Sequence, residues 1–125
     1  MGLKTLVRIL AFSAAAAMSL IEAALAHAML VEASPRVGGS VAEAPGEISL
    51  TFTERVEPSL SEISLTGANG QAVEMSAARS GATPRGLVAE IRRPLAPGRY
   101  RVEWSVVSVD GHSTKGDFSF AVGKP

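Results

Sequence analysis

Apolar and polar residues alternate in several short segments of this 125-residue chain, and no segment after residue 26 shows the period of a helix. Alternation with a period of two predicts half-buried β-strands, which have one face in the core and one in water. The clearest such segments are residues 47–54, 61–67, 86–93, 98–106 and 116–123, and the weaker ones are 29–34 and 71–76.

The segment 98–106 shows the alternation most clearly, because its charged residues fall between its apolar ones. The predicted core face of this strand carries Tyr100, Val102, Trp104 and Val106. Beyond this segment Val107 and Val109 interrupt the alternation, which indicates either a bulge or a strand covered on both faces.

Turn residues separate the predicted strands in the stretches "RVGGS", "EAPGE", "GANGQ", "GATPRG" and "LAPGRY". Gly, Pro and Asn at these points are typical of tight turns. About seven short strands separated by such turns predict an all-β, immunoglobulin-like sandwich of the Greek-key type.

The first 26 residues have the features of a secretory signal. Two basic residues precede an apolar stretch at 9–21, and Ala24 and Ala26 supply the small-x-small pattern of a cleavage site. A membrane anchor is disfavoured, because a span needs about 20 apolar residues and Glu22 interrupts the stretch. We therefore expect cleavage after Ala26.

Cleavage would leave residues 27–125 as one small domain with no membrane span. The remaining ten basic and eleven acidic residues are interspersed, so no clustered basic face indicates nucleic-acid binding. The chain has no cysteine, which excludes disulfides, thiolate metal sites and thiol nucleophiles.

The two histidines of the chain lie in contexts that favour metal binding. His27 would become the first residue after cleavage, and it would then carry an imidazole and a free α-amine with a reference pKa of about 8. Asp110 and His112 are two positions apart, which places both side chains on one face of an extended segment, and Gly111 between them frees the backbone.

Taken alone, an Asp and a His at this spacing are more often solvated turn residues than metal ligands. Together with a terminal His they form a set of three nitrogens and one oxygen, which suits Cu(II) in a tetragonal plane. A blue-copper site is excluded, since it needs a cysteine thiolate.

Three stretches, "HAMLVEASPRVGGSV", "ISLTFTERVEP" and "GRYRVEWSVVSVDGHSTKGDFSFAV", resemble the CopC family of exported copper-resistance proteins. The resemblance implies a Greek-key sandwich similar to cupredoxins. It also implies one Cu(II) ion bound by His27, through its amine and ring, and by Asp110 and His112. Glu54 in "TFTE" would hydrogen-bond and orient its neighbours at the site, although taken alone it is typical of an exposed acid at a strand end.

The resemblance further implies a periplasmic Cu(II) carrier or buffer that acts in copper homeostasis or resistance. Such a carrier would hand copper to an acceptor, for example an inner-membrane transporter of the CopD type. Some family members also carry a Met-rich loop for Cu(I), whereas this chain has only Met29 and Met75 after residue 26. We expect both methionines to fill gaps in the core and the Cu(I) site to be missing.

Two other functions remain open. A terminal His with a second His also resembles the histidine brace of copper mono-oxygenases. Such enzymes need an aromatic-rich substrate face, and most of the five aromatic residues after residue 26 fall on predicted core positions. The other is a metal-free structural sandwich, in which the Asp-x-His spacing and the position of His27 after the signal would both be coincidences. We therefore expect a binding protein and not an enzyme.

Overall fold

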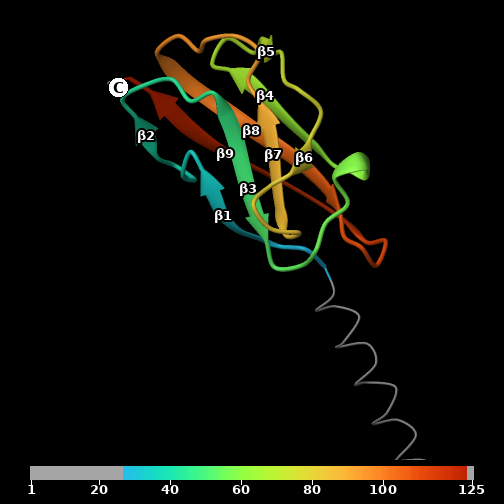
Figure 1. Cartoon of the computed structure of the whole chain (residues 1–125). Coiled ribbons are helices and arrows are strands. Elements are labelled where there is room, and N and C mark those ends of the chain that lie inside the picture. The colour runs from blue at the N-terminus through green and yellow to red at the C-terminus, as the bar shows by residue number, and fades with distance from the viewer. Residues whose placement is uncertain (1–26, 124–125) are drawn as a thin grey trace, which may run out of the picture.

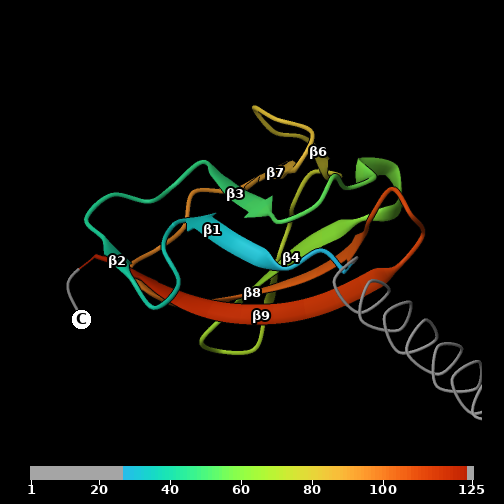
Figure 2. The same ribbon diagram turned by 90° about the horizontal axis from the view of Figure 1, so that it is seen from below.

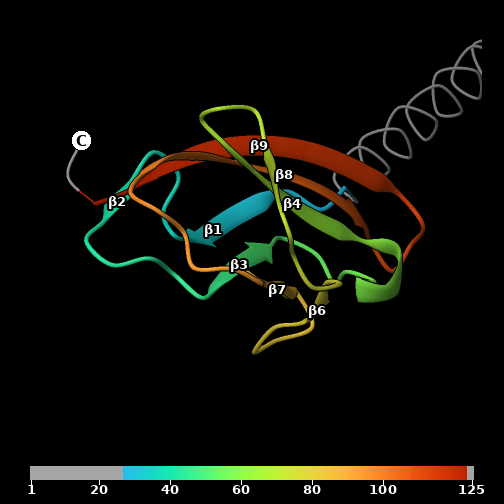
Figure 3. The same cartoon turned by 90° about the horizontal axis from the view of Figure 1, so that it is seen from above.

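The computed structural model describes residues 27–123 as two β-sheets packed face to face (Figures 1 and 2). The proposed signal at residues 1–26 lies outside the described residues. One sheet has the strand order β1-β3-β7-β6, and the other has the order β2-β9-β8-β4-β5. Viewed from above, the two layers face each other, and β8 and β9 extend beyond the shorter strands of the first sheet (Figure 3).

The first sheet consists of β1 (Leu30–Ser34), β3 (Glu47–Phe52), β7 (Gly86–Glu90) and β6 (Arg79–Ser80). The second consists of β2 (Ser40–Val41), β9 (Ser113–Val122), β8 (Gly98–Val107), β4 (Glu62–Gly67) and β5 (Ala72–Val73). All pairs are antiparallel except β2–β9. A 3-10 turn, η1 (Pro58–Leu60), connects β3 to β4.

The predicted all-β sandwich is therefore confirmed, and each of the seven predicted segments contains a strand. The additional strands are β2 and β6, which have two residues each and are too short to produce an alternation in the sequence. Within residues 27–123 there is no helix long and apolar enough to cross a membrane.

The core lies between the sheets and is built from alternate residues of the long strands. In β3 the buried side chains are Ile48, Leu50 and Phe52, as the alternation predicts. Trp104 of β8 is half-buried, and its ring contacts Phe52 edge-on at a centroid distance of 5.2 Å. This contact between large aromatic side chains joins the two sheets.

Trp104 needs a glycine on the neighbouring strand. It pairs with Gly116 of β9, and a Cβ atom at Gly116 would lie 2.2 Å from the indole ring. The ring therefore occupies the space that a side chain at this position would fill.

The sequence suggested that a bulge or a strand covered on both faces interrupts the alternation after Val106. The structure shows a different cause, the end of the strand. Strand β8 ends at Val107, and Val109 lies exposed in the loop that connects it to β9. The register of the β8–β9 hairpin pairs Val107 with Ser113, so the five residues 108–112 form a loop. The expectation of an extended segment at Asp110 and His112 is therefore wrong.

The two methionines also differ from expectation. Met75 is half-buried and packs against the core, as predicted. Met29 is 66% exposed, so its prediction as a core residue is wrong. Its neighbours Ala28 and Leu30 take the positions that face the core, and the alternation leaves Met29 pointing outward.

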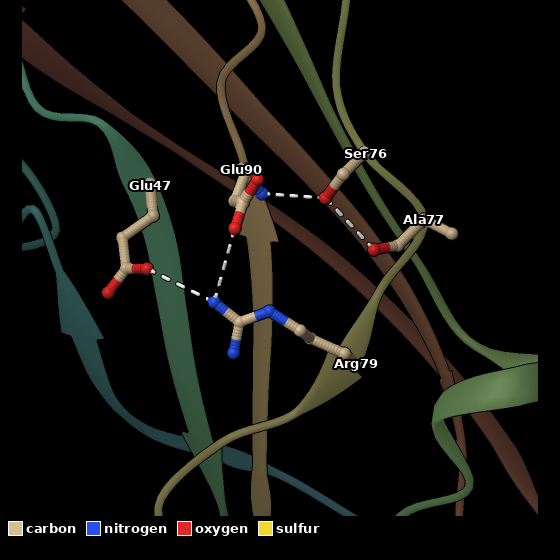
Figure 4. Close-up of polar contacts among 5 residues, drawn as sticks. All are labelled: Glu47, Ser76, Ala77, Arg79 and Glu90. Atoms are coloured by element: carbon tan, nitrogen blue, oxygen red, sulfur yellow. Dashed lines mark hydrogen bonds and ion pairs between the residues drawn. The ribbon is translucent and has the colours of Figure 1, made fainter.

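The outer face of the first sheet carries a small group of charged residues (Figure 4). Arg79 of the edge strand β6 lies 3.5 Å from a Glu47 carboxylate oxygen and 3.6 Å from one of Glu90. Beside it, the Ser76 hydroxyl accepts a hydrogen bond from the backbone N–H of Glu90. The ion pairs are exposed and contribute little stability, about 0–1 kcal/mol each.

We predict that Gly116→Ala lowers the free energy of unfolding by about 1–3 kcal/mol, because the added methyl group displaces the Trp104 ring. Gly46→Ala is the matched control, since nothing lies within 4 Å of a Cβ atom there. Both variants lose the same glycine backbone freedom in the unfolded chain. Urea denaturation measures the two changes, and equal stabilities would show that the indole can move aside without cost.

Candidate metal centre

Two segments far apart in the sequence meet at one end of the sandwich. The first described residues, drawn in blue, and the β8–β9 loop, drawn in orange, lie at the same end in Figure 1. The ring centroids of His27 and His112 are 4.9 Å apart, although the residues are 85 positions apart in the chain. The structure thus brings the two histidines of the chain together.

The segment that carries His27 is held by both sheets. Beyond the end of β3, Thr53 accepts a hydrogen bond from the Met29 N–H at its hydroxyl, at 3.0 Å, and donates its own N–H to the Met29 carbonyl at 2.8 Å. From β9, the Thr114 hydroxyl donates to the Ala28 carbonyl at 2.7 Å. Ala28 itself is buried, with 1% of its surface exposed. His27 therefore extends from an anchored piece of backbone.

The loop that carries Asp110 and His112 is a tight, internally bonded turn. The Ser108 N–H donates to the His112 carbonyl at 2.8 Å, and the Gly111 N–H donates to the Ser108 carbonyl at 2.9 Å. Gly111 has φ +90°, a conformation that other residues rarely adopt, so the glycine is required here. The loop folds back at this point and turns Asp110 toward His112.

The Asp110 carboxylate accepts several hydrogen bonds. One oxygen accepts from the hydroxyl of the buried Ser108 and from the backbone N–H of His112, and the other lies 3.2 Å from His112 Nδ1. The Ser108 hydrogen bond, followed by the interactions with His112, lowers the pKa of Asp110 from 3.8 to about 2. Asp110 is therefore ionised at any pH near neutrality.

The donor chemistry of this group fits a metal that prefers nitrogen and oxygen ligands. The side chains of His112 and Asp110 are 48% and 39% exposed, so an ion could reach them from solvent. Within residues 27–123, no three His, Cys, Asp or Glu side chains are already arranged to hold an ion together. The Asp110 carboxylate instead faces Ser108 and His112, so binding by all three residues would need rotation of side chains.

Glu54 lies two residues beyond β3, next to Thr53, and is half-buried. Within the described part of the chain no hydrogen bond joins it to His27, Asp110 or His112. Its orienting role at the site stays a prediction.

The sequence interpretation assigned no role to Ser108, Thr53 or Thr114. The role of Ser108 could have been inferred from the sequence. It continues the core face of β8 as a polar residue, and a buried polar side chain needs hydrogen-bond partners. Nothing in the sequence indicated the roles of the two threonines, since threonine is common on the solvent-exposed face of any strand.

Comparison with known proteins identifies the family. Residues 30–123 match the family described as CopC domain. The chain belongs to the CopC family. It is 40% identical over 105 residues to copper resistance protein C of Xanthomonas campestris pv. juglandis, which covers 79% of this chain and 82% of that protein.

Two crystal structures of CopC proteins share the fold. CopC from Methylosinus trichosporium OB3b matches with a TM-score of 0.72 and 38% identity, over 77% of this chain and 93% of that one. PcoC from Escherichia coli, a methionine-rich copper resistance protein, matches with a TM-score of 0.70 and 35% identity, over 78% of this chain and 99% of that one. The resemblance drawn from the sequence is confirmed, and this CopC-family chain is a copper-related protein whose relatives include proteins named copper resistance protein C and copper transport protein CutJ.

We predict that Ser108→Ala raises the pKa of Asp110 from about 2 toward 3.8, because it removes the hydrogen bond that contributes most to the lowered pKa. A folded-state pKa below the unfolded value stabilises the fold above the unfolded pKa, and this contribution is lost as the pH falls through the folded pKa. The variant should therefore lose more stability near pH 6 than near pH 2.

Carboxyl NMR titration and unfolding at both pH values measure this effect in the metal-free protein. Ser113→Ala, at an exposed position just after the loop, is the control. An unchanged Asp110 titration in the Ser108 variant would contradict the assigned cause.

Proposed function

We propose that this CopC-family protein is exported, cleaved after Ala26, and binds one Cu(II) ion through His27, Asp110 and His112. It would serve as a periplasmic copper carrier or buffer. The observation that carries the proposal is the 4.9 Å contact between the two imidazole rings, with an ionised carboxylate beside one of them.

Cleavage completes the ligand set. In the uncut chain the backbone nitrogen of His27 belongs to a peptide bond, which is a poor metal ligand at neutral pH. After cleavage this nitrogen becomes a free amine, and the amine and the imidazole ring of His27 can bind the same ion. The hydrogen bonds at Ala28 and Met29 would hold the new terminus beside the β8–β9 loop.

Copper would have to compete with contacts that exist in its absence. The Asp110 carboxylate would turn away from His112 Nδ1, which lies 3.2 Å away, to reach the ion. This reorganisation lowers the net affinity relative to a preassembled site. Reversible binding of this kind suits a carrier that must release its cargo.

The proposed ligands lie at an exposed end of the sandwich, where an acceptor protein can approach them. We propose an inner-membrane copper transporter of the CopD type as that acceptor. Transfer would require that donor groups of the acceptor replace the amine and imidazole of His27, the half-exposed imidazole of His112 and the carboxylate of Asp110.

We predict that one extra residue ahead of His27 lowers Cu(II) affinity by about tenfold or more, which corresponds to about 1.4 kcal/mol. The extension removes only the amine ligand, because it keeps both imidazoles and an exposed terminus tolerates added residues. His112→Ala should be at least as damaging, and Glu54→Gln should cost less because that residue would orient ligands without binding copper.

Chelator competition measures the affinities, and intact mass of the exported protein reports both cleavage and copper stoichiometry. Electron paramagnetic resonance of the native form should show nitrogen coupling. Equal affinity with and without the extension would mean that His27 acts as an ordinary internal residue, and an absence of nitrogen coupling would contradict the ligand set.

Copper affinity should fall as the pH is lowered from about 8 to about 5, because protons compete for the amine and the imidazoles, with reference pKa values of about 8 and 6.5. Asp110 should not contribute to this decline, since its pKa of about 2 keeps it ionised throughout. Competition titrations at several pH values test this, and a constant affinity would argue that the histidines are not ligands.

A further inference from the structure

Met29 is an exposed thioether beside the proposed copper site. At 66% it is the most exposed of the large apolar side chains in residues 27–123. Packing against the core does not explain its presence, because the inward positions of this segment belong to Ala28 and Leu30. The thioether is therefore accessible to an ion from solvent.

Met29 and His27 are both exposed and flank the buried Ala28. Burial thus alternates through this segment, and the two side chains lie on its solvent-exposed side. Two hydrogen bonds to Thr53 hold the Met29 backbone in place. The side chain is unbranched with three rotatable bonds, so its sulfur can adapt to a nearby ion.

We propose that the sulfur of Met29 and the imidazoles of His27 and His112 form a binding site for Cu(I). The proposal rests on the proposed function, because it shares both histidines with the Cu(II) site. Soft thioether ligands select Cu(I), whereas carboxylates suit harder ions, so Met29 would take the place that Asp110 has toward Cu(II). The ion is taken up already reduced, and the protein itself transfers no electron.

This site differs from the Cu(I) site that the sequence led us to expect to be missing. That site is the Met-rich loop of some family members, and this chain has no such loop. A single exposed methionine suffices here because two imidazoles 4.9 Å apart already supply the other donors.

The first test locates the ligand directly. After cleavage the chain contains two methionines, Met29 and Met75, so a protein labelled with 13C at the methionine methyl groups gives two assignable NMR signals. Ag(I), an air-stable ion with the preferences of Cu(I), should shift the Met29 signal and leave that of the half-buried Met75 in place. No shift of Met29, or equal shifts of both signals, would overturn the proposal.

The second test measures affinity with matched variants. Met29→Leu should weaken Cu(I) binding by about tenfold or more, measured anaerobically against a Cu(I) chelator, because it removes one ligand. Met75→Leu is the control and should change nothing. Cu(II) affinity and the paramagnetic resonance spectrum of the Met29 variant should equal those of the native protein.

The two proposals fail in different ways. A native protein that binds Cu(II) through nitrogen but shows the same Cu(I) affinity with and without the Met29 sulfur contradicts only the Cu(I) site. A native protein that shows no Cu(II) binding contradicts the proposed function, whatever the silver titration shows.

Discussion

The structure at the candidate site depends on the anchoring of one buried residue, Ala28, between the two sheets. Its side chain is excluded from water, and its carbonyl accepts a hydrogen bond from the Thr114 hydroxyl of one sheet. Its neighbour Met29 forms hydrogen bonds with Thr53 at the edge of the other sheet. Loose termini are the usual state of a small domain. Here three hydrogen bonds and a buried methyl group fix the backbone on which His27 is placed.

The second half of the site depends on the long β8–β9 hairpin. Ten residue pairs set its register, and this register leaves five residues for the loop that carries Asp110 and His112. A shift of one strand by one residue would move every side chain of that strand to the opposite face. The contact of Trp104 with Phe52, made possible by Gly116, stabilises the correct register from within the core.

The proposed ligands differ in chemical softness and would share the two imidazoles. Asp110 would bind from the hairpin loop as an ionised oxygen ligand, and Met29 would bind from the segment before β1 as a sulfur ligand. Because imidazole binds both oxidation states of copper, the flanking residue would determine which state is favoured. In such a site one end of a small sandwich would accept copper in either state without a second binding loop.

The sequence by itself determined the seven predicted strands and the sandwich, because burial with a period of two is a local property that Ile48, Leu50 and Phe52 display directly. It also named His27, Asp110 and His112 as candidates from their local contexts. Only the tertiary structure decided that His27 lies against His112, and that Met29 faces water. Both depend on pairing between segments distant in the chain, and alternation along one segment carries no information about its partner.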